Sequence, residues 1–579
     1  MAKQSVEEIK AESRGLRGKI VETLVSGATH FEEAEYQLLK FHGSYQQDDR
    51  DQRSERRKAK LEKAWSFMVR TKMPSGSMSS KQYLIHDEVA NDLGNSTLRL
   101  TTRQGIQLHG ILIGSLRDTI RTIQGSGLTT SGACGDVVRN TMGPAAPIKD
   151  ALHLDAEVVA QEISDRYFAK TNAFAQIWLD GEKLDMEKDI EEGKVETEEP
   201  IYGKHYLPRK FKIGISVPPC NDVDIFSQDI GLVPHAGADG SVEGYSIYVG
   251  GGFGMSHGKI ETHPVLAKPL CFVARDKVID ATDAIVGVQR DFGNREDRKQ
   301  ARMKYLIEAR GIEWFRKEVE SRLGFATEDV RETEFETVAD TLGWHEQGDG
   351  KLFCCVYISQ GRIMDYEGGP AYKAMLREIA EQIACKMRVT PNTNILFYDL
   401  EPSQREAVDA ILAKHSVPHS DGFTELRKVA HACVSMPTCG LALAESERIF
   451  NGVLDKVDDV LRKLKLEKEP ILVRMTGCPN GCARPYNCDF GFVGRGPNKY
   501  AMFVGGAITG DRLAGLEKKV VLLDDIPSEM RVYLEDFAKG RQEGETFSKW
   551  WGRTRTNGAA PHPEQFHIEL AEREAAKAI

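Results

Sequence analysis

Two stretches of the chain repeat one order of hydrophobic and polar positions. In each, apolar alternation predicts a strand, Pro or Gly a turn, four-residue apolar spacing a helix, and a further apolar run a last strand. The segments are 67–72, 74–76, 85–93 and 98–110 in the first stretch, and 351–359, Gly361, 375–383 and 387–397 in the second. Both last strands carry Arg-hydrophobic-Thr near their start, at Arg99 and Arg388. The pattern predicts an internal duplication.

A second, weaker pair of segments supports this duplication. A strand-like segment at 210–219 leads to 245–252, and one at 471–478 leads to 500–506. Both later segments end in consecutive glycines. Each half therefore contains modules that mix helices and strands, and we expect a pseudo-twofold protein with its site between the halves.

Size and composition limit the class of protein. At 579 residues the chain is too long for one core, and we expect about two to four domains. A hydrophobic fraction of 41% and a charged fraction of 28% are typical of globular proteins. The formal net charge of −10 argues against a nucleic-acid partner. Neither a signal region nor an apolar run of membrane-spanning length is visible, so we expect a cytoplasmic protein without a membrane partner.

Three segments lie outside the duplicated pattern. Residues 1–60 are predicted to form an arm, with helical periodicity over 6–25 and a solvated, mixed-charge face over 53–63. Residues 181–200 predict an acidic surface loop, and the tail from residue 559 predicts a charged helix.

Four of the eleven cysteines form a spaced set. They follow the pattern C-x5-C and C-x3-C: Cys433, Cys439, Cys478 and Cys482. Pro479 and Gly481 exclude a regular helix there, and loops can turn several sulfurs toward one point. Four thiolates can hold a tetrahedral metal or an iron–sulfur cube. The spacing departs from the C-x2-C knuckles of zinc sites, but iron–sulfur, zinc and unliganded thiols all remain open.

The other seven cysteines lack a partner pattern. Cys354 and Cys355 are adjacent and should face opposite sides of a strand. The remaining five are expected to be ordinary buried thiols: Cys134, Cys220, Cys271, Cys385 and Cys488. In a reducing compartment this usage favours cofactor ligation over disulfides.

Basic residues gather near predicted turns and strand ends. They are Arg70, Arg99, Arg103, Arg139, Arg209, Lys210 and Lys212, with a later group of Arg298, Lys299, Arg302 and Lys304. Ordinary surface charge explains any one of them. On a strand, however, Lys210 and Lys212 would point to the same face and could address one small anion. An acidic chain with such a set could bind a polyanion.

The glycine-rich run at 250–254 does not match a dinucleotide site. It lacks the G-x-G-x-x-G order that opens a helix, and His257 and Pro264 follow soon after. If the chain is a reductase, its electrons must come from another protein.

At this point several motifs together resemble one family. The C-x5-C set followed by T-G-C-P-N-G-C-A-R-P at 476–485 is similar to the siroheme and iron–sulfur signature of the siroheme-dependent sulfite/nitrite reductases. Segments 41–47, 98–104, 206–212 and 297–299 also resemble this family, so the likeness covers nearly the whole chain. Within the family it is nearest to the haemoproteins of assimilatory sulfite reduction.

The resemblance implies a fold and two cofactors. The fold would be α+β, a duplicated pseudo-twofold arrangement of three αβ domains around a central cofactor site. The cofactors would be siroheme and a 4Fe-4S cluster bridged through Cys482. Cys433, Cys439 and Cys478 would complete the cluster ligands. The implied domains are an arm (1–60), a duplicated ferredoxin-like domain (61–145 with 346–420), and two siroheme-binding domains (146–345 and 421–579).

The resemblance also assigns roles to the basic residues. Four correspond to the family's substrate cations in the six-electron reduction of sulfite to sulfide: Arg70, Arg139, Lys210 and Lys212. Siroheme carries many carboxylates, and the candidates to bind it are Arg99, Arg103, Arg209, Lys299, Arg302, Asn480 and Arg484. Arg and Lys donors can stabilise an oxyanion and deliver protons. A desolvated Lys among other cations has a lowered pKa and is a competent acid.

Alternatives remain within and outside the family. Siroheme nitrite reductases share the cofactors but tend to have an amide where this chain has Lys212, which favours sulfite. Dissimilatory sulfite reductases carry a further ferredoxin-like cysteine set that this sequence lacks. A non-catalytic iron–sulfur or zinc-binding interaction protein would leave the basic residues unexplained. The electron donor is either an NADPH-dependent flavoprotein subunit, which we favour, or ferredoxin.

Overall fold

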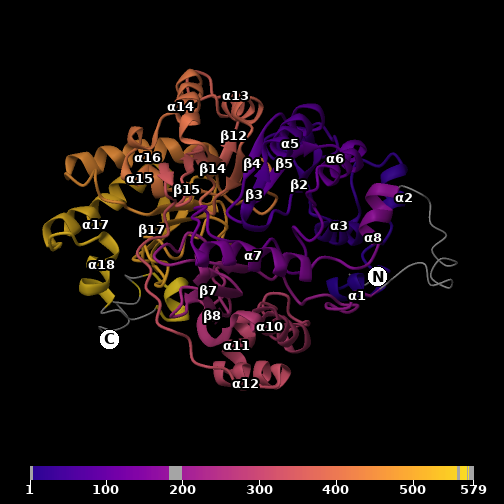
Figure 1. Ribbon diagram of the computed structural model, residues 1–579. Helices are drawn as coiled ribbons and strands as arrows, with labels where there is room; N and C mark the ends of the chain where they lie inside the picture. The colour runs from indigo at the N-terminus through magenta and orange to yellow at the C-terminus, as the bar shows by residue number, and fades with distance from the viewer. Residues whose placement is uncertain (1–3, 181–197, 557–560, 570–571, 573–579) are drawn as a thin grey trace.

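The computed structural model describes residues 4–180, 198–556, 561–569 and 572. Its duplicated centre consists of two five-stranded sheets with matching elements (Figure 1). The first half supplies β1 (Ser44–Asp48), β2 (Trp65–Arg70), β3 (Ser77–Ser79), α5 (Ser80–Leu93), β4 (Leu98–Leu100), β5 (Ile106–Ile111) and α6 (Ile113–Gly125). The second half supplies β10 (Gly343–Glu346), β11 (Leu352–Val356), β12 (Arg362–Ile363), α13 (Tyr372–Glu378), β13 (Lys386–Val389), β14 (Ile395–Leu400) and α14 (Arg405–Lys414).

The two central sheets exchange one strand with each other. Their orders are β1-β2-β5-β4-β12 and β10-β11-β14-β13-β3, which match strand for strand. In the first sheet Arg362 of β12 pairs with Arg99 of β4, and in the second Met78 of β3 pairs with Met387 of β13. The predicted duplication is therefore confirmed, and the exchange ties each half into the core of the other.

Two outer sheets repeat the second predicted module. One contains β6 (Ile213–Ile215), β7 (Ile230–Ala236), β8 (Val242–Val249) and β9 (Lys268–Ala274), with α7 (Ala151–Arg166) and α10 (Val278–Phe292). The other contains β15 (His431–Ala432), β16 (Val473–Thr476), β17 (Phe490–Gly496), β18 (Lys499–Val504) and β19 (Gly515–Leu522), with α16 (Glu447–Lys463) and α17 (Ile526–Gly540). Strands β6 and β7 are parallel, as are their counterparts β16 and β17, and the pairs that follow are antiparallel. In the second sheet β15 adds a further parallel strand beside β16.

The remaining helices cover the ends of these sheets. They are α1 (Val6–Glu12), α2 (Ile20–Val25), α3 (Glu33–Leu39), α4 (Arg53–Lys58), α8 (Ala173–Ala175), α11 (Met303–Arg310), α12 (Ile312–Leu323), α15 (Glu425–Val429) and α18 (Phe547–Trp551). Figure 1 places α10, α11 and α12 beneath β7 and β8, and α15 to α18 on the opposite side from α1 to α3. Among the described residues, no helix is both long and apolar enough to cross a bilayer.

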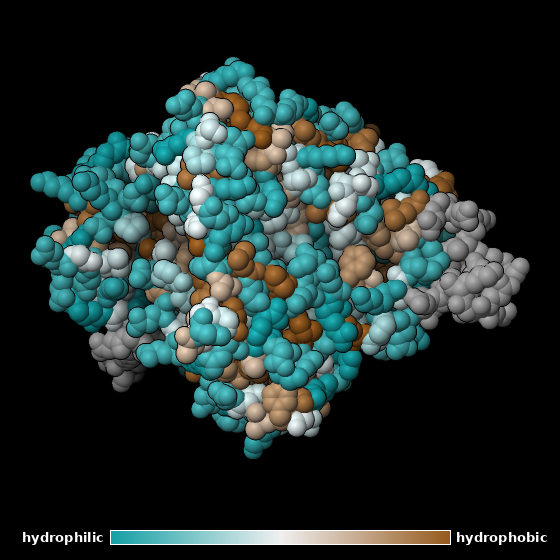
Figure 2. Space-filling view, in the orientation of Figure 1, coloured by the Kyte–Doolittle hydropathy of each residue, from teal (hydrophilic) through white to brown (hydrophobic). Residues whose placement is uncertain are grey.

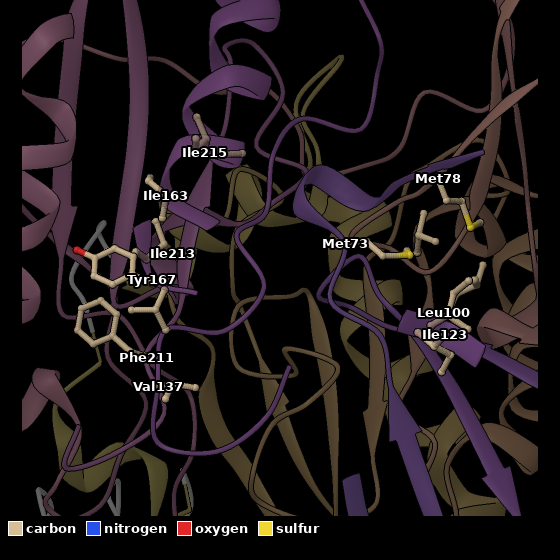
Figure 3. Close-up of a cluster of buried hydrophobic side chains, with 14 of the residues drawn as sticks. Met73, Met78, Leu100, Ile123, Val137, Ile163, Tyr167, Phe211, Ile213 and Ile215 are labelled. Atoms are coloured by element: carbon tan, nitrogen blue, oxygen red, sulfur yellow. The ribbon is translucent and has the colours of Figure 1, made fainter. Parts of the chain in front are cut away.

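The largest hydrophobic core joins the first outer module to both central sheets. Figure 3 shows part of it, with Met73, Met78, Leu100 and Ile123 in one group and Ile163, Phe211 and Ile213 in another. A second core lies among α16, α17 and the strands β16 to β18. On the face that Figure 2 shows, the surface is mainly hydrophilic, with apolar residues scattered in small groups.

The structure corrects three of the local expectations. The helix expected over 6–25 is two helices, because Arg14, Gly15 and Leu16 all have positive φ. The strand expected from residue 210 is only Ile213–Ile215, although Phe211 forms a bridge with Val138. The arm is not separate from the core, since β1 pairs with β2 throughout its length. Most of the expected acidic loop and of the expected tail helix lie outside the described residues.

The limits of the four expected domains stay a prediction. The central sheets draw β1 from the expected arm and β10 from the end of the expected first siroheme-binding domain. Strand β1 and most of β10, both in the central sheets, therefore lie outside the expected range of the ferredoxin-like domain.

Buried ion pairs lock the duplicated arginines in place. Arg388 lies on β13, is 0% exposed and pairs with Glu157 of α7 at 2.7 Å. Its counterpart Arg99 on β4 pairs with Glu447 of α16 at 2.8 Å, and Glu447 also holds Arg362 at 2.6 Å. The repeated Arg-hydrophobic-Thr signal therefore marks a contact between each central sheet and a helix of an outer module.

We predict that Glu447→Gln destabilises the protein by about 3 kcal/mol, because it leaves two largely buried guanidinium groups without their carboxylate. Glu445→Gln is the matched control, since Glu445 pairs with the exposed Arg448. It should cost less than about 1 kcal/mol. Urea denaturation followed by far-UV circular dichroism measures both. Equal losses in the two variants would contradict the locking role of Glu447.

Candidate functional site

The four spaced cysteines follow the ends of two neighbouring parallel strands. Ala432, the last residue of β15, pairs with Met475 of β16 in a parallel register. Cys433 follows β15 directly, and Cys478 comes two residues after the end of β16. The carboxyl ends of adjacent parallel strands lie at one edge of a sheet, so both cysteine loops leave from the same edge. The predicted loop conformation at Cys478 and Cys482 is confirmed.

Two glycines shape the second cysteine loop. The Gly477 N–H donates to Cys433 Sγ at 3.3 Å, and a Cβ on Gly477 would lie 2.0 Å from Ser435 Oγ. Gly481 has a φ of +65°, and its Cβ would lie 2.8 Å from the Tyr486 ring. A side chain at Gly477 would push the two cysteine loops apart, and one at Gly481 would collide with Tyr486, which explains the glycines of the T-G-C-P-N-G-C motif.

The four thiols influence one another electrostatically. Burial raises the pKa of Cys433, Cys439 and Cys478, and the charge of Cys482 raises each of them further. For Cys478 the pKa reaches about 12. Such thiols become thiolates only when a metal centre compensates their charge.

Polar hydrogens point at the sulfurs as they do around iron–sulfur clusters. Besides Gly477, the backbone N–H groups of Leu441 and Ala442 lower the pKa of Cys439. The Asn480 side-chain amide lies 3.5 Å from Cys478 Sγ. These donors fit a thiolate-ligated cluster, whose potential is tuned by hydrogen bonds to sulfur.

Four cysteine sulfurs can hold either a tetrahedral zinc ion or an iron–sulfur cube. Within the described ranges, no group of three or more His, Cys, Asp or Glu side chains is arranged to hold one metal ion.

Lys210 and Lys212 flank a buried aromatic anchor. Phe211 is 1% exposed, and its backbone binds Val137 and Arg139 at 3.0 and 2.9 Å. The extended alternation therefore places both lysines on the side away from Phe211. The Lys212 N–H donates to Asp229 Oδ2 at 2.8 Å, which fixes its position just before β6.

Both lysines lie in strongly positive surroundings. Burial, together with the charges of Arg103 and Arg302, lowers the pKa of Lys212 to about 7, whereas Asp229 and Cys482 oppose the shift. Burial also takes the pKa of Lys210 well below its usual value, with contributions from Arg209 and Lys212. The Thr102 hydroxyl, next to Arg103 in the chain, donates to the Cys482 carbonyl at 3.1 Å, so the second cysteine loop lies beside the cationic group that surrounds Lys212.

Arg70 and Arg139 join the same region through Tyr45. Arg70 Nη1 lies 3.0 Å from Cys134 Sγ, and its guanidinium is 5.9 Å from the centre of the Tyr45 ring. Arg139 donates from Nε to the Gly135 carbonyl at 2.8 Å and forms a hydrogen bond with Tyr45. Because Arg139 also lowers the pKa of Lys210, the structure brings all four predicted substrate cations together.

The candidate siroheme ligands fall into two groups. Three guanidinium groups each have a carboxylate partner: Arg302 contacts Asp229 at 2.9 Å, Arg99 contacts Glu447 at 2.8 Å, and Arg484 lies 3.4 Å from Asp224. By contrast, Arg103 donates only to carbonyls and to Gln228, and burial lowers its pKa to about 9.

The other three candidates differ in exposure. Arg209 lies 3.9 Å from Asp136, and burial lowers its pKa to about 10. Asn480 faces the cysteine loop through Cys478. Lys299 is exposed beside Lys259, and the described contacts do not bring it into the cationic group.

Sequence reasoning missed three residues of this region. Burial lowers the pKa of Lys40 to about 8, and its ammonium lies 4.0 Å from the Tyr36 ring centre. Tyr45 connects the two substrate arginines, and Cys134 contacts Arg70 rather than being an isolated thiol. Tyr45 lies inside the 41–47 motif, which was the available signal, whereas nothing in the local sequence marks Cys134.

Two family models match the chain. One, described as "Nitrite and sulphite reductase 4Fe-4S domain", matches residues 134–326. The other, described as "Nitrite/Sulfite reductase ferredoxin-like half domain", matches 61–125 and 345–415, the two segments that form most of the central sheets. The relatives described next are similar over nearly the full length of the chain. The chain belongs to the nitrite and sulfite reductase family.

Curated relatives of this family extend the match to both ends. The sulfite reductase (NADPH) hemoprotein beta-component of Staphylococcus haemolyticus is 42% identical over 565 residues, which covers 97% of each chain. The protein of the same name from Methylobacterium nodulans is 44% identical over 542 residues, which covers 93% of this chain and 89% of the relative.

A solved structure supports the fold. The Mycobacterium tuberculosis NirA protein is similar with a TM-score of 0.75 at 22% identity, over 96% of this chain and 95% of the other. At this identity the likeness shows the fold alone. The duplicated α+β fold predicted from the sequence is thus confirmed. The 4Fe-4S family model matches residues 134–326, which form the first outer module, whereas the four spaced cysteines lie in the second. This match is consistent with two outer modules that share one fold.

We predict that the amine of Lys212 titrates near neutral pH in the cofactor-free protein. Its pKa is lowered from 10.5 to about 7, so between these values the unfolded chain binds a proton that the folded chain does not. This group's contribution to stability therefore rises with pH over that window. Competitive acylation with peptide mass spectrometry should give half-maximal labelling near pH 7. Labelling that instead follows a free lysine derivative, near pH 10.4, would contradict the cationic surroundings.

Proposed function

We propose that this chain reduces sulfite to sulfide with six electrons at a siroheme coupled to a 4Fe-4S cluster. One observation carries the proposal: the second cysteine loop accepts a hydrogen bond from Thr102, the neighbour of Arg103, and Cys482 acts on Lys212, within a group of buried cations that lower one another's pKa values. Cations that depress one another's pKa values favour a bound polyanion, since negative charge relieves their repulsion. The relatives' name, sulfite reductase, supports the same reaction.

The cluster ligands in this proposal are Cys433, Cys439, Cys478 and Cys482, with Cys482 shared between cluster and siroheme. When bound, the two cofactors supply an iron for the sulfur of the substrate and deliver electrons to it. Cys482 is the exposed member of the set and the one that acts on Lys212. Its thiolate is therefore the natural point of contact between the two cofactors.

The chain's own cations bind the substrate and supply protons. Arg70 and Arg139 retain fixed positions through Cys134, Gly135 and Tyr45, and can orient an oxyanion. Lys212 has a pKa of about 7, so it can hold and release a proton at neutral pH. Lys210 provides a second depressed amine two residues away.

The cations that lack a short carboxylate partner among the described residues are the ones proposed to bind the siroheme carboxylates. We assign direct contacts to Arg103 and Arg209, which have no short carboxylate partner in the described structure. Arg99, Arg302 and Arg484 instead hold the walls of the site through their protein partners. Asn480 supports the cluster through Cys478. Lys299 would contact a carboxylate only at the outer rim.

The electron donor is a separate protein in this proposal. The glycines at 250–254 are explained by packing, since a Cβ on Gly251 would lie 2.3 Å from the Phe226 carbonyl. The curated relatives are named for NADPH, and an NADPH-dependent flavoprotein subunit is therefore the proposed partner, with ferredoxin as the alternative. A cytoplasmic location stays a prediction.

Replacement of the shared ligand tests the cofactor assignment. Cys482→Ser should abolish sulfide production and uncouple the siroheme from the cluster, because serine does not bridge two irons as a thiolate does. Cys488→Ser is the matched control, since Cys488 is buried six residues away and its thiol donates to the Pro485 carbonyl at 3.3 Å. Activity assays, optical spectra and iron content of both variants provide the readouts. Wild-type activity in Cys482→Ser would refute the ligand assignment.

Replacement of Lys212 tests the choice of sulfite over nitrite. Lys212→Asn removes an amine that can release a proton near neutral pH, so sulfite turnover should fall about tenfold or more while nitrite is relatively favoured. The ratio of kcat/KM values for the two anions, driven by reduced methyl viologen, measures this. An unchanged ratio would show that Lys212 does not discriminate between them.

A further inference from the structure

The first cysteine loop exposes two leucines beside a cluster ligand. Leu441 is 66% exposed and Leu443 is 41% exposed, although Ala442 between them is 2% exposed. Both lie within four residues of Cys439. A partner surface that covers these two leucines would remove them from water, and complete burial of a leucine side chain contributes about 1.5–3 kcal/mol of free energy.

The leucine loop is fastened to the segment that precedes α4. Arg50 Nη1 donates to the carbonyls of Cys439 and Ala442 at 3.1 and 2.6 Å, and its backbone N–H donates to the Pro437 carbonyl at 3.2 Å. The neighbouring Asp51 pairs with Arg448 at 2.6 Å. Residues 50–51 therefore bring the start of α4 alongside the leucine loop.

The segment next to this loop carries concentrated positive charge. Residues 53–63 contain six basic and two acidic side chains in a chain whose net charge is −10. No residue of α4 is buried. Arg53 pairs with Asp48, but the described contacts give no ion pair to four exposed members of the segment: Arg57, Lys58, Lys60 and Lys63. Leu61, in the same segment, is 58% exposed.

We propose that Leu441, Leu443 and the basic segment 53–63 form the docking surface for the electron-donor protein. The partner is an acidic protein that carries its redox cofactor near the docked face. This inference rests on the proposed function and specifies where electrons enter. The charged run 53–63, which the sequence predicts to be a solvated helix face, would thus contact the partner protein.

Geometry and charge both support this assignment. The backbone N–H of Leu441 acts on the Cys439 sulfur, so a partner that covers Leu441 lies two residues from a proposed cluster ligand. An acidic face complements the unpaired cations, which speeds encounter at low salt. A few apolar side chains with a charged rim suit the small, transient interfaces of electron-transfer complexes.

The test compares protein donors with a small donor in the cofactor-loaded, full-length protein. The variants are Leu441→Ser/Leu443→Ser and Arg57→Glu/Lys58→Glu. With reduced methyl viologen, which needs no docking, sulfite reduction should stay within about twofold of wild type. The protein donors are an NADPH-driven flavoprotein subunit in one arm and reduced ferredoxin in the other. For whichever donor supports turnover, kcat/KM should fall about tenfold or more in both variants, mainly through a higher KM for the donor. In the charge variant, kcat/KM should no longer depend on salt concentration.

A matched charge variant keeps the test specific. Arg310→Glu/Lys317→Glu changes the same charge at α11 and α12, which pack with α10 and β9. It should leave both assays unchanged. Wild-type kinetics with protein donors in the docking variants, or equal losses in the control, would overturn the proposal. So would loss of the viologen reaction in the leucine variant, since the loop would then serve the cluster itself. Failure of the wild-type protein to reduce sulfite with viologen would instead refute the proposed function.

Discussion

Mutual repulsion among buried cations is the constraint on which the rest of the structure depends. Lys210, Lys212, Arg103 and Arg209 all have lowered pKa values because burial removes water and their neighbours are positive. Carboxylates compensate part of this charge, as Asp229 does for Arg302 and Asp136 for Arg298. The positive charge that is left uncompensated suits a polyanionic cofactor and an anionic substrate. The thiolate of Cys482 lies at the edge of this cationic group.

The duplicated fold supplies this site by making its two halves different. The Lys212 N–H donates to Asp229 at 2.8 Å, and at the matching place in the other outer module the Leu472 N–H donates to Asp489 at 2.8 Å. The backbone is thus the same, but one half carries a lysine and the other a leucine. Burial raises the pKa of Asp489 to about 7, and its second oxygen lacks a partner among the described atoms. The cysteine loops belong to the leucine half, so cations and sulfurs approach from opposite modules.

The sequence could predict the parts of this account that have a local signal. Apolar periodicity revealed the duplication, and the T-G-C-P-N-G-C run with its distant C-x5-C partner identified the cysteine loops. The shared face of Lys210 and Lys212 also followed from alternation, although the regular strand begins only at Ile213. The exchange of β3 and β12 could not be predicted, because strand order depends on contacts between residues far apart in the chain.

The sequence could not predict the roles of the individual arginines, because these roles also depend on contacts between residues far apart in the chain. Arg99 and Arg103 lie four residues apart in one motif, yet Arg99 is held by Glu447 of α16 while Arg103 donates to carbonyls and an amide. Cys134 and Lys40 likewise depend on distant partners for their surroundings. Only tertiary packing decides which charges are compensated and which remain available to an anion.

The metal content of the purified full-length protein, produced in cells that make siroheme, tests the central claim most directly. The account predicts about five irons per chain, one in the siroheme and four in the cluster, together with a Soret band and a long-wavelength chlorin band. A protein that contains stoichiometric zinc, or iron without either optical band, would contradict a cationic site built for siroheme beside a 4Fe-4S cluster.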